Sequence, residues 1–164
     1  MLGPLAFRCA LLFPGSWAAI SLGQPSMVVA QAGRSATLGC KASTKVSYIH
    51  WYHHQEGAAP KRLLRLDMSG TFVQKDGGLN EDKVNAKRGK GSNSCDLSVL
   101  ELEKSDEGVY YCAAWEVKGS GWIMVFAEGT KVIVTPPDKS PDEDTSPKPT
   151  IFLPSPAERT LHKT

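Results

Sequence analysis

Asp106-Glu107-Gly108-Val109-Tyr110-Tyr111-Cys112 is the most informative segment of this chain. Upstream of it lie a second cysteine, Cys40, and a tryptophan, Trp51. In a sandwich of two β-sheets, cysteines placed in this way bridge the sheets and the tryptophan packs on the bridge. A tyrosine two residues before the second cysteine hydrogen-bonds back into the preceding turn. The segment therefore predicts a Cys40–Cys112 disulfide, with Trp51 and Tyr110 in the core beside it.

The central region has the pattern of many short strands. From residue 24 to about residue 135, short runs of alternating apolar residues are separated by clusters of Gly, Asn, Asp and Ser. The chain is therefore expected to be all-β, an immunoglobulin V-type two-sheet Greek-key sandwich with a disordered C-terminal tail. Leu97 and Asp106 complete the expected frame. We expect Leu97 in the core and Asp106 in an ion pair with Lys83.

The N-terminal residues are typical of a secretory leader. Met1 to about Gly23 contain one cation, Arg8, followed by apolar residues, although Pro14-Gly15 interrupts the apolar run. Ser21-Leu22-Gly23 offers small residues at the two positions that a signal peptidase reads. We therefore expect residues 1–23 to be a signal peptide and residues 24–136 to be the domain. The alternative is an unstructured start. A disulfide also indicates an oxidising compartment, and hence the secretory pathway.

The composition changes abruptly after Thr135. Pro136–Asp144 is rich in proline and acidic residues, as linkers are. Ile151–Leu153 provides apolar residues for only one strand. No segment after Gly23 offers the run of about 20 apolar residues that crosses a membrane, so we expect no transmembrane segment in this fragment.

Charge and motif content argue against several classes of function. The formal net charge of +2 suggests neither a nucleic-acid partner nor an anionic membrane surface. His50 and His54, on one strand, would lie about 13 Å apart, too far to share a metal ion. No nucleophile–base pair, phosphate-binding glycine loop or metal-spaced Cys/His set is found, so we expect no catalytic residue, metal or cofactor. No N-x-[ST] acceptor for an N-linked glycan occurs.

Strand alternation predicts an aromatic outer face. If Trp51 points into the core, its neighbours on the strand, Tyr52 and His54, point out of the opposite face. Aromatic side chains gathered on a solvent-side face are what a paired domain buries, whereas single surface aromatics are common. We therefore expect a partner-chain interface made of Tyr52, His54, Pro60, Tyr111 and Phe126.

Cys95 is left over from the cysteine frame. It has the same strand parity as Leu97 and Val99, which places it on the core side. We expect a buried, inert thiol. The alternative is a free thiol that is open to mispairing or oxidation.

Several segments resemble one receptor family. Tyr48–Leu64 closely resembles the second framework of T-cell receptor gamma variable regions, and Val109–Trp115 resembles the end of that variable segment. Phe126–Val134 is similar to a gamma joining segment, although Ala127 stands where the first glycine of the usual F-G-x-G motif is expected. Ser146–Ser155 resembles the opening of the gamma constant region. The resemblance therefore implies that residues 137–164 are a linker and the truncated start of a constant domain.

The resemblance implies an antigen-recognition module without enzymatic activity. It implies pairing with a T-cell receptor delta chain, assembly with invariant signalling subunits through parts missing here, and a place on the external side of the plasma membrane. An unknown cell-surface or presented antigen would be bound by three hypervariable loops at one end of the sandwich. The loops consist of Ser43, Thr44, Lys45, Val46, Ser47 and Tyr48; of Asp67, Met68, Ser69, Gly70, Thr71 and Phe72; and of Trp115, Glu116, Val117, Lys118, Gly119, Ser120, Gly121, Trp122, Ile123 and Met124.

The sequence leaves two questions open. Trp115 can contact the ligand, or it can pack against the partner domain. The chain as a whole has an alternative interpretation as a secreted or cell-surface V-type adhesion or light-chain-like domain. A joining-type strand that runs directly into the start of a constant region argues against that alternative.

Overall fold

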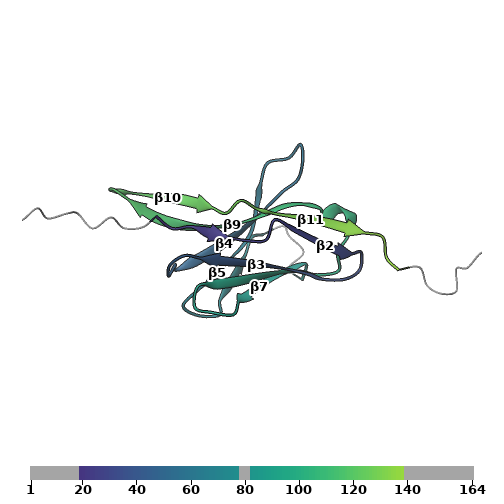
Figure 1. Cartoon of the computed structure of the whole chain (residues 1–164), viewed down its shortest axis with the longest axis horizontal. Helices are drawn as coiled ribbons and strands as arrows, with labels where there is room; N and C mark the ends of the chain where they lie inside the picture. Colours follow the sequence, from purple (N-terminus) through teal and green to yellow (C-terminus); the bar gives the residue numbers. More distant parts are fainter. Residues whose placement is uncertain (1–18, 78–81, 139–164) are drawn as a thin grey trace, which may run out of the picture.

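A computed structural model describes residues 19–77 and 82–138 and shows two β-sheets packed face to face (Figure 1). The smaller sheet has the strand order β1-β3-β8-β7. The larger sheet has the order β2-β11-β9-β4-β5-β6, and β10 pairs with β9. The predicted all-β sandwich is confirmed. The expected disordered tail and most of the expected leader lie outside the described residues.

The strand bounds follow the alternating runs of the sequence. In the smaller sheet they are β1 (Leu22–Gly23), β3 (Ala36–Ala42), β7 (Val84–Arg88) and β8 (Ser94–Val99). In the larger sheet they are β2 (Met27–Gln31), β4 (Tyr48–His54), β5 (Lys61–Asp67), β6 (Val73–Lys75), β9 (Gly108–Lys118), β10 (Gly121–Phe126) and β11 (Thr130–Thr135). A 3-10 turn, η1 (Lys104–Asp106), precedes β9.

The core lies around the predicted disulfide. Cys40 on β3 is bonded to Cys112 on β9, with a Cα–Cα distance of 6.3 Å, so the bridge joins the two sheets. Trp51 and Leu97 are completely buried. Cys95 lies directly opposite Cys40 on the neighbouring strand and is a buried free thiol, as expected. The indole N–H of Trp51 donates a hydrogen bond to Cys95 Sγ at 3.3 Å.

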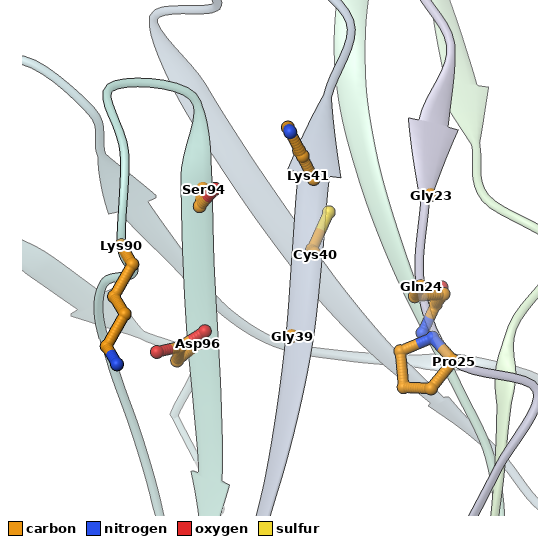
Figure 2. Close-up of a pocket in the computed structure, with 9 residues that line it drawn as sticks. All are labelled: Gly23, Gln24, Pro25, Gly39, Cys40, Lys41, Lys90, Ser94 and Asp96. Carbon is orange, nitrogen blue, oxygen red and sulfur yellow. The ribbon is translucent and has the colours of Figure 1, made fainter.

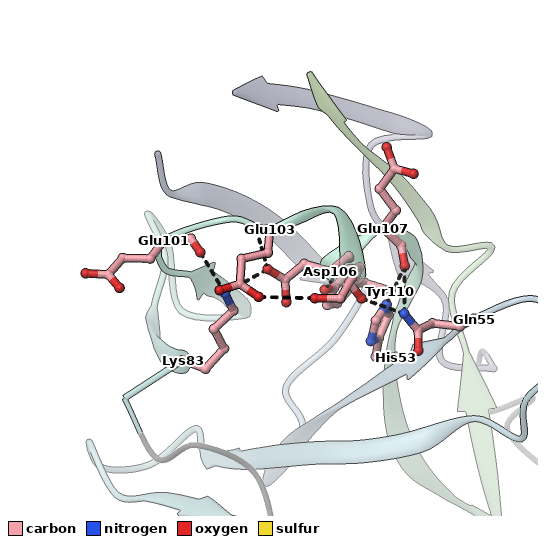
Figure 3. Close-up of polar contacts among 9 residues, drawn as sticks. His53, Gln55, Lys83, Glu101, Glu103, Asp106, Glu107 and Tyr110 are labelled. Carbon is pink, nitrogen blue, oxygen red and sulfur yellow. Dashed lines mark hydrogen bonds and ion pairs between the residues drawn. The ribbon is translucent and has the colours of Figure 1, made fainter. Parts of the chain in front are cut away.

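The turn before β9 has the predicted contacts (Figure 3). The hydroxyl of Tyr110 donates a hydrogen bond to the carbonyl oxygen of Asp106 at 2.8 Å. The Asp106 carboxylate forms the expected ion pair with Lys83, at 2.8 Å. Gly108 has a φ of 139°, and a Cβ atom there would lie 2.5 Å from the carbonyl oxygen of His54. Only glycine fits this position, which explains the glycine of the motif.

Candidate functional site

The five residues expected at a partner interface line one hollow of about 420 Å³ on the outer face of the larger sheet. Tyr52 on β4 and Tyr111 on β9 are directly opposite each other in register. The ring of Phe126 lies 5.3 Å from the ring of Tyr52, centroid to centroid. His54 and Pro60 complete the lining. Strand alternation predicts this grouping. Residues two apart on one strand project from the same face of a sheet, and so do residues directly opposite each other on neighbouring strands.

The backbone at Gly129 passes directly beside the ring of Tyr111, one of the residues that line this hollow. Its φ is 97°, and a Cβ atom there would lie 2.7 Å from Cε1 of Tyr111 and 2.6 Å from Cγ1 of Val109. Ala127 has an ordinary negative φ and is buried, and its N–H donates to the carbonyl oxygen of Cys112 at 2.9 Å. A methyl group is therefore accommodated at position 127, but not at position 129.

The β9–β10 hairpin extends from the edge of this hollow, where Phe126 ends β10. The segment expected as the third loop is mostly strand, because β9 runs to Lys118 and β10 starts at Gly121. Trp122 pairs with Val117 across this hairpin, and Trp115 pairs with Met124. The turn is therefore only two residues long, and Gly119 has the positive φ, 62°, that such turns favour. Most of the expected loop is therefore paired as two antiparallel strands.

A second hollow, of about 400 Å³, lies at this end of the domain. It is lined by Ser47, Tyr48, Trp115 and Trp122, which come from the first and third predicted loops. Trp122 is 67% exposed and Trp115 is 46% exposed. The guanidinium of Arg65 lies 5.0 Å from the centroid of the Tyr48 ring, a cation–π contact that holds the ring in place. The sequence predicts these residues in two separate loops but does not indicate that they converge on one hollow.

The first and second predicted loops adjoin each other. Lys45, Ser47, Asp67 and Ser69 share the lining of one hollow of about 470 Å³. The Asp67 carboxylate accepts hydrogen bonds from the Ser69 hydroxyl at 2.7 Å and from the Ser69 backbone N–H at 2.8 Å. These bonds, with the hydroxyl contributing most, lower the pKa of Asp67. The carboxylate therefore stays ionised and orders the turn.

Two residues assigned to ligand-binding loops are buried. Val46 is 7% exposed and Met68 is 5% exposed, and both belong to the core cluster. Their apolar side chains tie the two loops to the core, because burial removes apolar surface from water. Val46 also lines the hollow between the first and second predicted loops. A direct ligand contact of either residue stays a prediction.

His50 was not recognised from the sequence as unusual. It is 2% exposed, and neither ring nitrogen has a hydrogen-bond partner. Burial, followed by the nearby charges of Arg62 and Arg65, lowers its pKa to about 4. The side chain is therefore neutral at physiological pH. Strand alternation alone predicts an outward-facing, solvated histidine, so this burial is evident only in the folded domain.

The described residues contain no group of His, Cys, Asp and Glu side chains that could hold a metal ion. Over the same ranges, no helix is long and apolar enough to cross a membrane. His53 has a structural role on the core side of β4, where it stacks on Tyr110 at 4.2 Å and hydrogen-bonds the carbonyl oxygen of Glu107 at 3.0 Å.

Comparison with known proteins gives the family. Residues 23–135 match the family model of the immunoglobulin V-set domain. Human T cell receptor gamma variable 4 is 38% identical over 114 residues, which cover 68% of this chain and 96% of that relative. The chain belongs to the T cell receptor gamma variable family. Human T cell receptor gamma variable 3 is similar at 39% identity over 109 residues, with 65% of this chain and 92% of the relative covered.

Solved receptor structures have the same fold as this gamma variable domain. A chain described as a marsupial T cell receptor is 43% identical with a TM-score of 0.65, over 71% of this chain and 52% of that chain. A second marsupial T cell receptor chain is 35% identical with a TM-score of 0.66, over 72% of this chain and 54% of that chain. The chain thus spans about half the length of these solved chains. It is an antigen-receptor variable domain, and its relatives are receptors and not enzymes.

Proposed function

We propose that this gamma variable domain is the antigen-recognition module of a gamma-delta T cell receptor and that it pairs with the variable domain of a delta chain. The hollow lined by Tyr52, His54, Pro60, Tyr111 and Phe126 carries the proposal. Its walls come from three strands and one turn of the larger sheet, and Phe126 leaves 50% of its surface exposed. An aromatic concavity of this kind accepts an apolar anchor from a facing domain, and burying it supplies binding energy.

Ligand binding is assigned to the other end of the same face. The hollow between Tyr48, Trp115 and Trp122 offers large, rigid aromatic walls, which lose little conformational entropy on binding. Lys45 and Asp67, of opposite charge, line the adjoining hollow, which shares Ser47 and Tyr48 with this one. The antigen, a cell-surface or presented molecule, is accordingly held by aromatic anchors with a polar rim.

The relatives are T cell receptors, so we place this chain on the external side of the plasma membrane. Invariant signalling subunits are proposed as further partners of the assembled receptor. The near-neutral formal charge of +2 offers no basis for a nucleic-acid partner.

Co-expression tests the pairing. The full chain is secreted together with each of a panel of T cell receptor delta variable domains, and the product is analysed by size exclusion. We expect a one-to-one complex that Tyr111→Glu weakens by about 2–4 kcal/mol, because the charge would be buried in the aromatic hollow. Thr37→Glu is the matched control, since Thr37 is an exposed position on β3 in the other sheet.

A complex that Tyr111→Glu disrupts and Thr37→Glu preserves supports the receptor-chain function. A folded monomer that pairs with no delta domain contradicts it and favours the secreted or cell-surface V-type adhesion domain. A complex that survives Tyr111→Glu unchanged contradicts the assignment of the hollow as the interface.

A further inference from the structure

The residues just before Gln24 are integral to the folded domain. Leu22 and Gly23 form strand β1, which pairs with Ala42 and Lys41 of β3. Figure 2 shows Gly23 beside the strand that carries Cys40 and Lys41. Ile20 and Leu22 also pack against the core cluster. A leader that ended at Gly23 would take these core contacts with it.

The contacts continue upstream of β1. Ser21 exchanges two hydrogen bonds with Ser43, one from the Ser21 N–H to the Ser43 hydroxyl and one from the Ser43 N–H to the Ser21 carbonyl, both 2.9 Å. The N–H of Ile20 donates to Oε1 of Glu116 at 2.9 Å. Glu116 belongs to the β9–β10 hairpin, so the first described residues reach the loop end of the domain.

Gln24 fixes the direction in which the chain leaves β1. Its side-chain amide nitrogen donates to the carbonyl oxygen of Tyr110 and to the hydroxyl of Thr130, both at 2.8 Å. Its amide oxygen accepts from the N–H of Cys112 at 3.0 Å. Gly23, Gln24 and Pro25 together form one wall of the hollow in Figure 2. As a free N-terminus, Gln24 would lose the strand that precedes and positions it.

We propose that signal peptidase cleaves this chain between Ala18 and Ala19. The reaction hydrolyses one peptide bond with one water molecule, leaving a carboxylate on Ala18 and a new α-amino group on Ala19. Ser16 and Ala18 provide the small residues that the enzyme reads on the leader side of the cut. The cut keeps every contact of residues 20–24 in the mature domain.

The sequence around this bond fits better than that around Gly23. Pro14-Gly15 ends the apolar run of the leader shortly before Ala18, as expected at the start of a cleavage region. Before Gly23, by contrast, the apolar residues of Trp17–Ile20 intervene. A cut after Ala19 would place Trp17 at the outer recognition position. A cut after Ser21 satisfies the size rule, but it removes the hydrogen bonds of Ile20 and Ser21.

This cleavage also shapes the ligand-binding end of the domain. The new α-amino group lies one residue before Ile20, whose N–H is bound to Glu116 of the hairpin. A retained leader would be attached at this point, beside the predicted third loop. Cleavage after Ala18 therefore removes the leader from the loop end of the domain. Residues 19–23 remain as the N-terminal segment of the mature domain, where they keep their contacts with β3 and β9.

The test is translation of the full chain in a cell-free system with endoplasmic-reticulum microsomes, followed by mass spectrometry of the N-terminal peptide of the processed product. Cleavage on the nascent chain does not depend on pairing or on ligand, so the outcome is separate from that of the proposed function. We expect the product to begin at Ala19. A product that begins at Gln24 or Leu22, or an unprocessed chain, overturns the proposal.

Two matched variants sharpen the result. Ala18→Tyr places a large side chain next to the proposed cut and should abolish the product that begins at Ala19. Gly23→Tyr makes the same change at the alternative site and should leave the product unaltered. Loss of processing in Gly23→Tyr, with normal processing in Ala18→Tyr, overturns the proposal.

Discussion

A side chain at Gly129 would collide with the ring of Tyr111, since its Cβ atom would lie 2.7 Å from Cε1. Gly129→Ala should therefore displace that ring and strain a backbone whose φ is 97°. We expect a loss of about 1–3 kcal/mol in the free energy of unfolding, measured by denaturant titration, together with weaker pairing. Gly119→Ala is the control, because its φ is also positive but nothing lies within 4 Å of its Cβ position. Equal losses of pairing in both variants would contradict the steric explanation.

The turn before β9 offers a test of one hydrogen bond. Tyr110→Phe removes the hydroxyl that donates to the Asp106 carbonyl at 2.8 Å and keeps the ring that stacks on His53. We expect the free energy of unfolding to fall by about 1–2 kcal/mol, because a partly buried carbonyl loses its partner. Tyr111→Phe, on the outer face, should leave stability within about 0.5 kcal/mol. Similar stabilities for the two variants would show that the Tyr110 bond contributes little.

We expect the buried His50 to make the free energy of unfolding depend on pH. Burial holds its folded-state pKa at about 4, below the usual 6.5, with the charges of Arg62 and Arg65 acting in the same direction and Asp76 opposing them. The unfolded chain therefore binds more protons than the folded one between pH 4 and 6.5, and stability falls as the pH drops through this window. The loss from His50 alone is at most about 3 kcal/mol.

His50→Leu should flatten that part of the profile, because leucine fills a similar volume without a proton to bind. Denaturant titrations at several pH values between 4 and 7 measure the difference in slope between the variant and the parent. His54→Leu serves as the control on the same strand, since no buried, unpartnered ring is lost there. Parallel profiles for the parent and His50→Leu would contradict the burial argument.

Much of the frame could be predicted from local sequence, because each signal is a residue type at a fixed spacing. Cys40, Trp51 and Cys112 specify the disulfide and the side chain that packs on it. Asp106 forms the predicted ion pair with Lys83, at 2.8 Å. Strand parity was sufficient to group the lining of the aromatic hollow, because alternation needs only the direction of one anchor residue.

The remaining features depend on contacts between distant segments. The third loop is a hairpin because Val117 and Trp122 pair across the two-residue turn Gly119-Ser120. A Gly-Ser pair between two strand-like runs is a local signal for such a hairpin, and the expectation of a hypervariable loop left it out of account. Val46 and Met68 are buried by the rest of the sandwich, which alternation within a loop does not foresee. Leu22 pairs with Ala42, so strand β1 is visible only once β3 is in place.

Cys95 permits a test of the inert-thiol expectation. The thiol is completely buried beside Trp51, and burial raises its pKa to about 11. Because the thiolate is the reactive form and the sulfur is inaccessible, Cys95 of the native, processed domain, from which Cys9 has been removed with the leader, should not react with iodoacetamide near pH 8. Labelling should become complete in denaturant without reductant, while the Cys40–Cys112 bridge stays intact. Mass spectrometry of the alkylated protein over time gives the rate, which should follow that of global unfolding. Rapid labelling of the native domain at Cys95 would instead support the alternative of a redox-sensitive thiol.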